Sequence, residues 1–512
     1  MKPAGVGFVF EVMPTTLSLS PREAWQPLPA EEWNSDAAQH LLRRTGWTAR
    51  PENVERAKQE GLAATLERLF PGDPPLLAKP RLVTRFEEAT PELQRNLRNL
   101  SGEEKLRRQR ELQERGRIAL QDLSIKWLEY AARPENSAAA KWTLFLSDVY
   151  VVSAEKVRNA GLIYEHFDLL TRHGLGPAPA LSKAVSRSPA MVIYLDLQQS
   201  QRKAPNENFA RELFELFVLG EGNYSENDIK EAARAFTGYR NQPPGTFRYV
   251  PQQHDGTPKT VFGATGNFTG DDVIDLAYRQ KSAATFLPHE LAKFYLSDAP
   301  IPAEHLTALG DSWRASGFEL RALARQFFGS RLFFAPEFRG NFIKSPIQFY
   351  LGLVQDLRLD VAPIPRLTLN PLRQMGQQLF YPPNVRGWVG GRNWINSATI
   401  TARRQLVETL FAPIDEAALN ADEQIDLIAA RTNGATNFTV PDQALAAFTR
   451  GNAGETAETL CRTLLPADVT ADVRDAVRGF LTADNAGAAP PPPRRVRRAV
   501  VTVLQAPEYQ LC

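Results

Sequence analysis

The sequence from Pro205 to Gly238 is PNENFARELFELFVLGEGNYSENDIKEAARAFTG, and it has the pattern of two helices joined by a turn. Asn206 follows a proline and is placed to cap the first helix, and Gly220 is placed to end it. Ser225 followed three residues later by Asp228 is typical of a capping box at the start of the second helix. The apolar residues of the first helix share one face and are predicted to enter the core: Phe209, Leu213, Leu216 and Phe217.

The first of these helices also carries a polar stripe. Glu207, Arg211 and Glu215 are spaced four residues apart, so they lie above one another on a helix. Asn208 and Glu212 form a neighbouring row. One interpretation is a ladder of exposed ion pairs, each worth about 0.3 to 0.5 kcal/mol. The other is a functional site, because carboxylates, an arginine and amides at a helix start suit a metal, an anion or a general base.

The composition is that of a globular protein with a sizeable core. The chain has 512 residues, of which 43% are hydrophobic and 23% are charged. Its formal charge of +2 gives no reason to expect a nucleic-acid partner, and no apolar run reaches the roughly 18 residues that a transmembrane helix needs. Cys461 and Cys512 cannot form a disulfide framework or a cysteine-based zinc site, although one bridge is left open.

The N-terminus gives only a weak signal for export. It reads MKPAGVGFVFEVMPTTLSLS, in which Glu11 interrupts a short apolar run. Met1 and Met13 are both candidates for the true start of the chain. The compartment is therefore undetermined: cytoplasmic is the default expectation and export stays open.

Helical patterns dominate the rest of the chain, with one small β insertion. Ser101 and Glu104 have the spacing of a capping box, and apolar residues at helical spacing then continue until Pro134, which predicts one long helix. The runs TFRYV at 246–250 and KTVFG at 259–263 lie among glycines and prolines and are predicted to pair as a β-hairpin near 246–263. The expected fold class is mainly α.

The predicted organisation has six segments. A weakly ordered leader at 1–35 precedes an N-terminal helical half at 36–245, which holds the stretch 205–238, called the central segment below. A loop or hairpin at 246–270, a C-terminal helical half at 271–487, a proline-rich linker at 488–493 and a last helix at 494–512 follow. The two halves are expected to form either one large domain or two packed domains divided near residue 245.

A second candidate site is the sequence QQHDGTPKTVFG, which contains His254, Asp255 and Lys259. A surface turn is the structural interpretation of His-Asp-Gly in a loop. Histidine is scarce, however, with six in the chain, and the other five lie in helical patterns. Trp388 and Trp394, in the glycine-rich GWVGGRNW, can line a pocket or anchor a loop to the core.

These candidates define a predicted site, with two groups of residues. The proposed catalytic groups are Glu207, Glu212 and His254, and the proposed binding groups are Asn206, Asn208, Arg211, Asp255, Lys259, Trp388 and Trp394. No metal ligands are assigned, and a divalent metal is left open as a cofactor. We predict that the charged and amide groups of the first helix meet His254 in one pocket, reached by the loop around Gly256.

Several segments resemble the bacterial family called domain of unknown function 1800. They are HLLRRTGW at 40–47, SPAMVIYLD at 188–196, the stretch at 205–239, HDGTPKTVFG at 254–263, FFAPEF at 333–338, YPPNVRGWVGGRNWINSATITARR at 381–404 and APEYQL at 506–511. The resemblance implies a mostly helical bacterial protein, in a family without an established activity and with many apparently exported members. It also implies an association with a sulfatase-like protein, which is often encoded beside members of the family.

The chain departs from the family pattern at one block. Typical members carry Trp-His-x-His-Phe after a Lys-x-Thr-Leu-Phe stretch, and residues 141–145 here match that lead-in. Leu146, Ser147, Val149 and Tyr150 stand where the tryptophan, the two histidines and the phenylalanine would be. Two histidines so spaced could bind a metal, which serine and valine cannot replace.

Two functions are therefore weighed. The first is a non-catalytic, degenerate member of the family that acts as a scaffold or accessory protein. The alternative is a metal-dependent, hydrolase-type enzyme that acts on a polymeric or sulfated substrate, with Glu207, Glu212 and His254 as acid, base or ligand groups.

Overall fold

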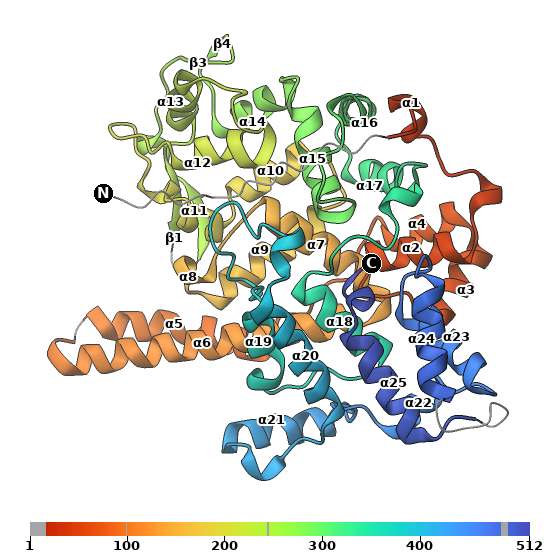
Figure 1. The fold of residues 1–512 in the computed structure, drawn as a ribbon. Helices are drawn as coiled ribbons and strands as arrows, with labels where there is room; N and C mark the ends of the chain where they lie inside the picture. The colour runs from red at the N-terminus through yellow and green to blue at the C-terminus, as the bar shows by residue number, and fades with distance from the viewer. Residues whose placement is uncertain (1–16, 99, 243–244, 483–489) are drawn as a thin grey trace, which may run out of the picture.

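Helices make up most of the protein, as the sequence predicts (Figure 1). The computed structural model describes residues 17–98, 100–242, 245–482 and 490–512. Helices and short helical turns fill both halves of the chain, and the two small sheets lie between them in the sequence. The predicted fold class, mainly α with a small β insertion, is confirmed.

Thirteen α-helices precede the sheets in the described part of the chain. They are α1 (Pro21–Ala24), α2 (Ser35–Thr45), α3 (Pro51–Glu60), α4 (Leu62–Leu69), α5 (Arg81–Arg98), α6 (Gly102–Ala132), α7 (Ser137–Val149), α8 (Ala154–Val157), α9 (Ala160–His173), α10 (Ala178–Ser186), α11 (Pro189–Tyr194), α12 (Asn208–Glu212) and α13 (Glu226–Ala235).

Twelve more follow the sheets within the described residues. They are α14 (Gly270–Arg279), α15 (Ala283–Tyr295), α16 (Ala303–Ala315), α17 (Leu320–Gly329), α18 (Pro346–Asp356), α19 (Pro365–Gln374), α20 (Ser397–Phe411), α21 (Ala421–Thr432), α22 (Asp442–Ala446), α23 (Ala453–Leu464), α24 (Ala471–Thr482) and α25 (Pro493–Gln505).

The β insertion consists of two hairpins rather than one. Strand β1 (Tyr239–Gln242) pairs with β2 (Thr246–Tyr249), and β3 (Lys259–Val261) pairs with β4 (Ala264–Gly266), both antiparallel. The predicted pairing of 246–250 with 259–263 is therefore wrong. The reason is local: Phe262 and Gly263 have φ of 49° and 78°, the left-handed pair of a two-residue hairpin turn, so β3 turns back on its own neighbour.

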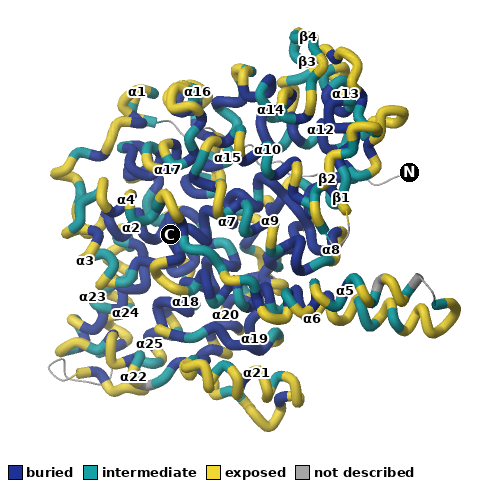
Figure 2. The backbone as a smooth tube through the Cα atoms, turned by 180° about the vertical axis from the view of Figure 1, so that it is seen from behind, coloured by how far each residue is buried: buried dark blue, intermediate teal, exposed yellow. Residues whose placement is uncertain are grey.

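One hydrophobic core joins the helices of both halves. Its buried residues run from Ala24 to Tyr509, and two smaller clusters lie beside it, one around Leu42 and Ala57 and one around Ile364 and Leu427. In Figure 2 the buried residues fill the body of the molecule, and the exposed ones follow its rim. The division near residue 245 stays a prediction, because a shared core is compatible with one domain or with two packed ones.

A two-helix arm of α5 and the first half of α6 projects from the body (Figures 1 and 2). The predicted long helix is confirmed as α6, which begins after Ser101 and ends before Pro134. The Ser101 side chain makes no capping hydrogen bond, so the predicted capping box is not formed. The buried residues of α6 begin only at Gly116, so its second half belongs to the core and its first half to the arm.

Buried cations close the ends of three helices. Arg44 donates to the carbonyl oxygens of Tyr295 (2.8 Å) and Leu296 (3.0 Å) at the end of α15. In the same way Arg43 donates to Thr463 (2.8 Å) at the end of α23. Lys141 donates to Arg44 (2.7 Å) and Gly46 (3.1 Å) at the end of α2. Each cation thereby satisfies carbonyl groups that a helix leaves without an internal partner.

The two ends of the chain are described only in part. Of the leader at 1–35, residues 1–16, including Met1 and Met13, lie outside the described residues, whereas 17–35 contain α1 and the buried Trp25. Residues 488 and 489 of the predicted linker also lie outside them, and α25 begins at Pro493. Cys461 and Cys512 are both free and buried, so they form no bridge. Within the described ranges no helix has the length and apolarity to cross a membrane.

Candidate functional site

The start of α12 is fixed by two asparagines. The Asn206 side chain accepts a hydrogen bond from the backbone amide of Asn208 (2.9 Å), but the N-cap residue of α12 is Glu207 and not the predicted Asn206. The Asn208 side chain donates to the carbonyl oxygen of Leu195 (3.3 Å) and ties the helix start to the end of α11. Both side chains are therefore engaged in holding the backbone.

The polar stripe is broken by a π-helical turn over Leu213–Val218. This turn adds a residue to the helical repeat, so Glu215 leaves the row of Glu207 and Arg211. Arg211 contacts Glu207 at 3.4 Å, and its second partner is not Glu215 but Glu226 of α13, to which it donates two hydrogen bonds of 2.9 and 2.8 Å. The predicted ladder is thus an ion-pair cluster that joins α12 to α13, without Glu215.

Glu215 and Glu212 face the loop that precedes α20. Glu215 accepts hydrogen bonds from Tyr224 (2.8 Å) and from Arg386 (2.7 Å), and Arg386 also pairs with Glu221 at 2.5 Å. Glu212 is half-buried, and this burial, with the nearby charge of Glu215, raises the pKa of its carboxyl group. Glu215 and Glu221 therefore hold Arg386, which lies two residues before Trp388.

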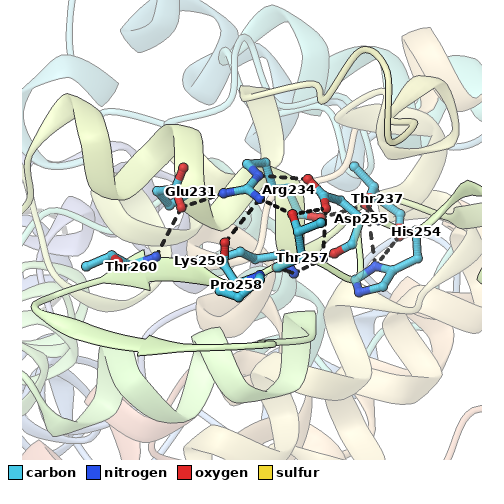
Figure 3. Close-up of polar contacts among 9 residues, drawn as sticks. All are labelled: Glu231, Arg234, Thr237, His254, Asp255, Thr257, Pro258, Lys259 and Thr260. Carbon is cyan, nitrogen blue, oxygen red and sulfur yellow. Dashed lines mark hydrogen bonds and ion pairs between the residues drawn. The ribbon is translucent and has the colours of Figure 1, made fainter.

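The loop that contains His254 and Asp255, called the His-Asp loop, forms its own network around Arg234 of α13 (Figure 3). Arg234 Nε donates to Asp255 (2.8 Å), and the backbone amide of Asp255 donates to the Thr237 hydroxyl (2.8 Å). Burial alone would raise the pKa of Asp255, but the hydrogen bonds from Arg234 and Thr257 outweigh it and hold that pKa well below its usual range. The side chain of Asp255 is thus a fixed, ionised partner of Arg234.

The two other groups of that loop are also engaged. His254 Nδ1 lies 3.1 Å from the Thr237 carbonyl oxygen, and burial lowers the pKa of its imidazole. Lys259 is buried and donates to the carbonyl oxygens of Asp255 (2.5 Å) and Thr257 (3.1 Å). These contacts give the loop a fixed shape.

The predicted site residues fall into separate clusters of contacts. Among the described residues, no hydrogen bond or ion pair joins Asn206, Glu207, Arg211 or Glu212 to His254. Their convergence in one pocket stays a prediction. The described parts of the chain contain no group of three or more His, Cys, Asp or Glu side chains that could hold a metal ion, so these residues do not supply a donor set for a divalent cation.

A different pocket contains the two predicted tryptophans. This tryptophan pocket lies between α7, α15, the start of α18 and the loop before α20, and encloses about 60 Å³. Its aromatic and charged lining includes Lys141, Asp148, Glu290, Lys293, Trp388 and Trp394. Trp388 and Trp394 line this pocket, whereas none of the other predicted site residues does, so their place in the predicted site stays a prediction.

Two ionisable groups of α7 reach this pocket. Asp148 accepts a hydrogen bond from the backbone amide of Trp388 (2.8 Å), and burial raises its pKa to about 7. Burial lowers the pKa of Lys141 to about 7 as well. Such opposite shifts in one cavity are typical of functional sites.

Neither Asp148 nor Lys141 was predicted as a site residue, although the sequence holds a signal for them. They are the only charged residues in SAAAKWTLFLSDV, the sequence of α7. A separation of seven residues places them two turns apart on the same face of a helix. Two lone charges on one face of an otherwise apolar helix indicate a polar cavity in the core.

The residues of the predicted departure from the family pattern also lie here. Ser147 and Val149 are in the last turn of α7, and Val149 lines the tryptophan pocket. Ser147 donates to the carbonyl oxygen of Leu144 (2.8 Å), and Tyr150 hydrogen-bonds with Ser182 (3.0 Å). Leu146 is fully buried in the core. This turn of α7 is therefore one wall of the pocket.

Gly387 allows the loop before α20 to approach Asp148. Its φ of 72° is left-handed, and an added Cβ would collide with the Asp148 carboxylate. We expect Gly387→Ala to lower the free energy of unfolding by about 2 kcal/mol or more, measured by urea denaturation. Gly434→Ala is the matched control, since Gly434 has φ of 92° with nothing close to an added Cβ, and should cost only about 1 kcal/mol. Equal losses in the two variants would contradict the close approach.

Comparison with known proteins identifies a family but no characterised relative. The family described as Protein of unknown function (DUF1800) matches residues 40–511. No curated protein and no solved structure matches the chain. Because the match extends over nearly the whole sequence, the chain belongs to the DUF1800 family of proteins of unknown function.

Proposed function

We propose that this protein is a non-catalytic member of its family that acts as a scaffold or accessory protein. The observation that carries the proposal is that three charged side chains of the central segment and the His-Asp loop already have partners within the fold. Arg211 is paired with Glu226, Asp255 with Arg234, and Lys259 with two backbone carbonyl oxygens. Side chains held in this way stabilise the fold. A catalytic side chain, by contrast, must be able to form a hydrogen bond with the substrate.

We also propose that the chain is a divergent member that lacks the Trp-His-x-His-Phe block. Lys141 and the four residues after it match the usual lead-in, whereas Ser147 and Val149 occupy the histidine positions. The partner that we propose is the sulfatase-like protein associated with the family.

Elemental analysis of the purified full chain tests this function against a metal-dependent hydrolase that acts on a polymeric or sulfated substrate. We expect no stoichiometric metal in the wild-type protein, and the same result for Glu207→Gln and His254→Ala. Glu207→Gln should change the free energy of unfolding by less than about 0.5 kcal/mol, because its pair with Arg211 is exposed. His254→Ala should cost about 1 kcal/mol through the lost contact with Thr237.

The opposite result would be a stoichiometric metal that both variants lose while they remain folded. That outcome would contradict the scaffold role and favour the metal-dependent alternative. The partner is tested separately, by co-purification of the tagged full chain with the sulfatase-like protein. Retention of the partner supports an accessory role, and its absence from the eluate at micromolar concentrations contradicts this choice of partner.

A further inference from the structure

The tryptophan pocket contains hydrogen-bond donors that the fold does not use. Most of the other tryptophans donate their indole N–H to a backbone carbonyl oxygen: Trp25, Trp33, Trp47, Trp142 and Trp313. In the described part of the chain, the indole N–H groups of Trp388 and Trp394 have no such acceptor, although both rings are only 8% exposed. A largely buried indole normally finds a hydrogen-bond partner, so these two donors are available to a ligand.

Acceptors and further donors surround the two indoles. Asp148 uses one carboxylate oxygen for the backbone amide of Trp388, and its other oxygen accepts no hydrogen bond from any described residue. Gln377 accepts from the Ile347 backbone amide through its carbonyl oxygen, and within the described ranges its amide nitrogen donates to nothing. The pocket therefore offers both donors and acceptors next to aromatic rings.

The charges in the pocket balance one another. Asp148 and Glu290 are acidic, and Lys141 and Lys293 are basic. Glu290 and Lys293 form only a long ion pair of 3.7 Å at the rim. An anion would meet two carboxylates and a cation two ammonium groups, so a ligand with a net charge gains little from this site.

We propose that the tryptophan pocket binds a neutral sugar ring. A sugar hydroxyl both donates and accepts hydrogen bonds, which matches the free indole N–H groups, the Gln377 amide and the open oxygen of Asp148. The apolar C–H face of a sugar packs on an aromatic ring, and Trp388 and Trp394 supply such rings. A ligand site with apolar aromatic walls and a few placed polar groups has this composition.

The pocket volume of about 60 Å³ suits one edge of a single ring with its hydroxyls. Val389, a residue that is 67% exposed, lines the pocket and lies between the two tryptophans in the sequence. Gly390 and Gly391 follow it and add no side chain to the lining.

This inference does not rest on the scaffold role. A non-catalytic protein and an enzyme can both hold a sugar, and the elemental analysis above reports nothing about this pocket. The two proposals can therefore fail separately.

The test is saturation-transfer NMR and calorimetric titration of the full chain with glucose, galactose, mannose and N-acetylglucosamine at millimolar concentrations. Choline and acetate are the charged probes, one cationic and one anionic. We expect at least one sugar to bind, and Asp148→Asn and Trp394→Ala each to weaken it by about tenfold or more. Asp311→Asn and Trp33→Phe are matched controls: Asp311 is exposed, and Trp33 donates to Ala57 away from the pocket. Both should bind as the wild type does.

Three results would overturn the proposal. One is the absence of binding for all four sugars at millimolar concentrations. Another is binding of choline or acetate in preference to every sugar. The third is sugar binding that survives unchanged in both folded pocket variants, since that sugar would occupy another site. Asp148→Asn keeps the size of the side chain and its acceptor for Trp388, so a failure to fold is not expected for it.

Discussion

Replacing Arg44 with alanine is expected to lower the free energy of unfolding by about 3 kcal/mol or more. The guanidinium is fully buried and donates to the carbonyl oxygens of Tyr295 and Leu296, at the end of α15, and to that of Phe338. Alanine would leave these buried acceptors without a partner, and each such group costs about 1 to 3 kcal/mol. The variant would also lose the packing of the guanidinium on the Phe342 ring, 4.9 Å away.

Urea denaturation followed by circular dichroism measures this loss. The matched control is Arg107→Ala, at a side chain that is 72% exposed on the arm and 3.9 Å from Glu104. That change should stay within about 0.5 kcal/mol, because an exposed ion pair of this length contributes little. If the two variants were equally stable, the buried arginine would not be closing the helix, and the account of the core would fail.

Local patterns in the sequence predicted the helices well, because their signals lie within a few residues of each helix end. Ser225 and Asp228 form the predicted capping box, whereas the N-cap of α12 is Glu207, one residue after the predicted Asn206. The same kind of signal was missed at Gly263, whose hairpin turn decides that β3 pairs with β4. A glycine at this position is therefore the local signal that separates the two hairpins.

Two kinds of feature could not be predicted from the sequence: contacts between distant segments, and a local departure from regular helix geometry. Arg44 lies at a position that helical periodicity leaves polar, and only α15, some 250 residues later, makes it a buried cap. The π-helical turn at Leu213–Val218 moved Glu215 out of the predicted stripe, and periodicity assumes a regular helix. Charge spacing alone therefore misplaced the members of the cluster.

The tryptophan pocket shows the same limit for a site. Trp388 was a candidate from its own segment, but Asp148 lies 240 residues away, and only the folded chain brings its carboxylate to the Trp388 amide. The lone charges of α7 were a readable signal, because Lys141 and Asp148 interrupt an apolar helix on one face. Which loop covers them is a property of the fold.

Asp148→Asn is expected to make the protein more stable at about pH 8, by up to about 4 kcal/mol. Burial favours the neutral carboxyl group and raises the pKa of Asp148 to about 7, whereas it is about 4 in the unfolded chain. Between these two values the folded state binds the extra proton. The contribution of Asp148 to stability is thus present below about pH 4 and is lost as the pH rises toward 7.

The amide in this variant is neutral at every pH and keeps an oxygen for the Trp388 backbone amide, so it avoids that loss. The difference in unfolding free energy between variant and wild type should therefore be small at about pH 4 and grow until about pH 7. Lys141 and the buried His166 titrate in both proteins, so their contributions cancel in the difference. Urea denaturation at several pH values measures this difference, and Asp311→Asn, at an exposed position, should show no such growth.

A variant less stable than wild type at about pH 8 would mean that the ionised carboxylate is held by a partner in the pocket. A gain in stability together with weaker sugar binding would show that the fold keeps a destabilising group there for its ligand.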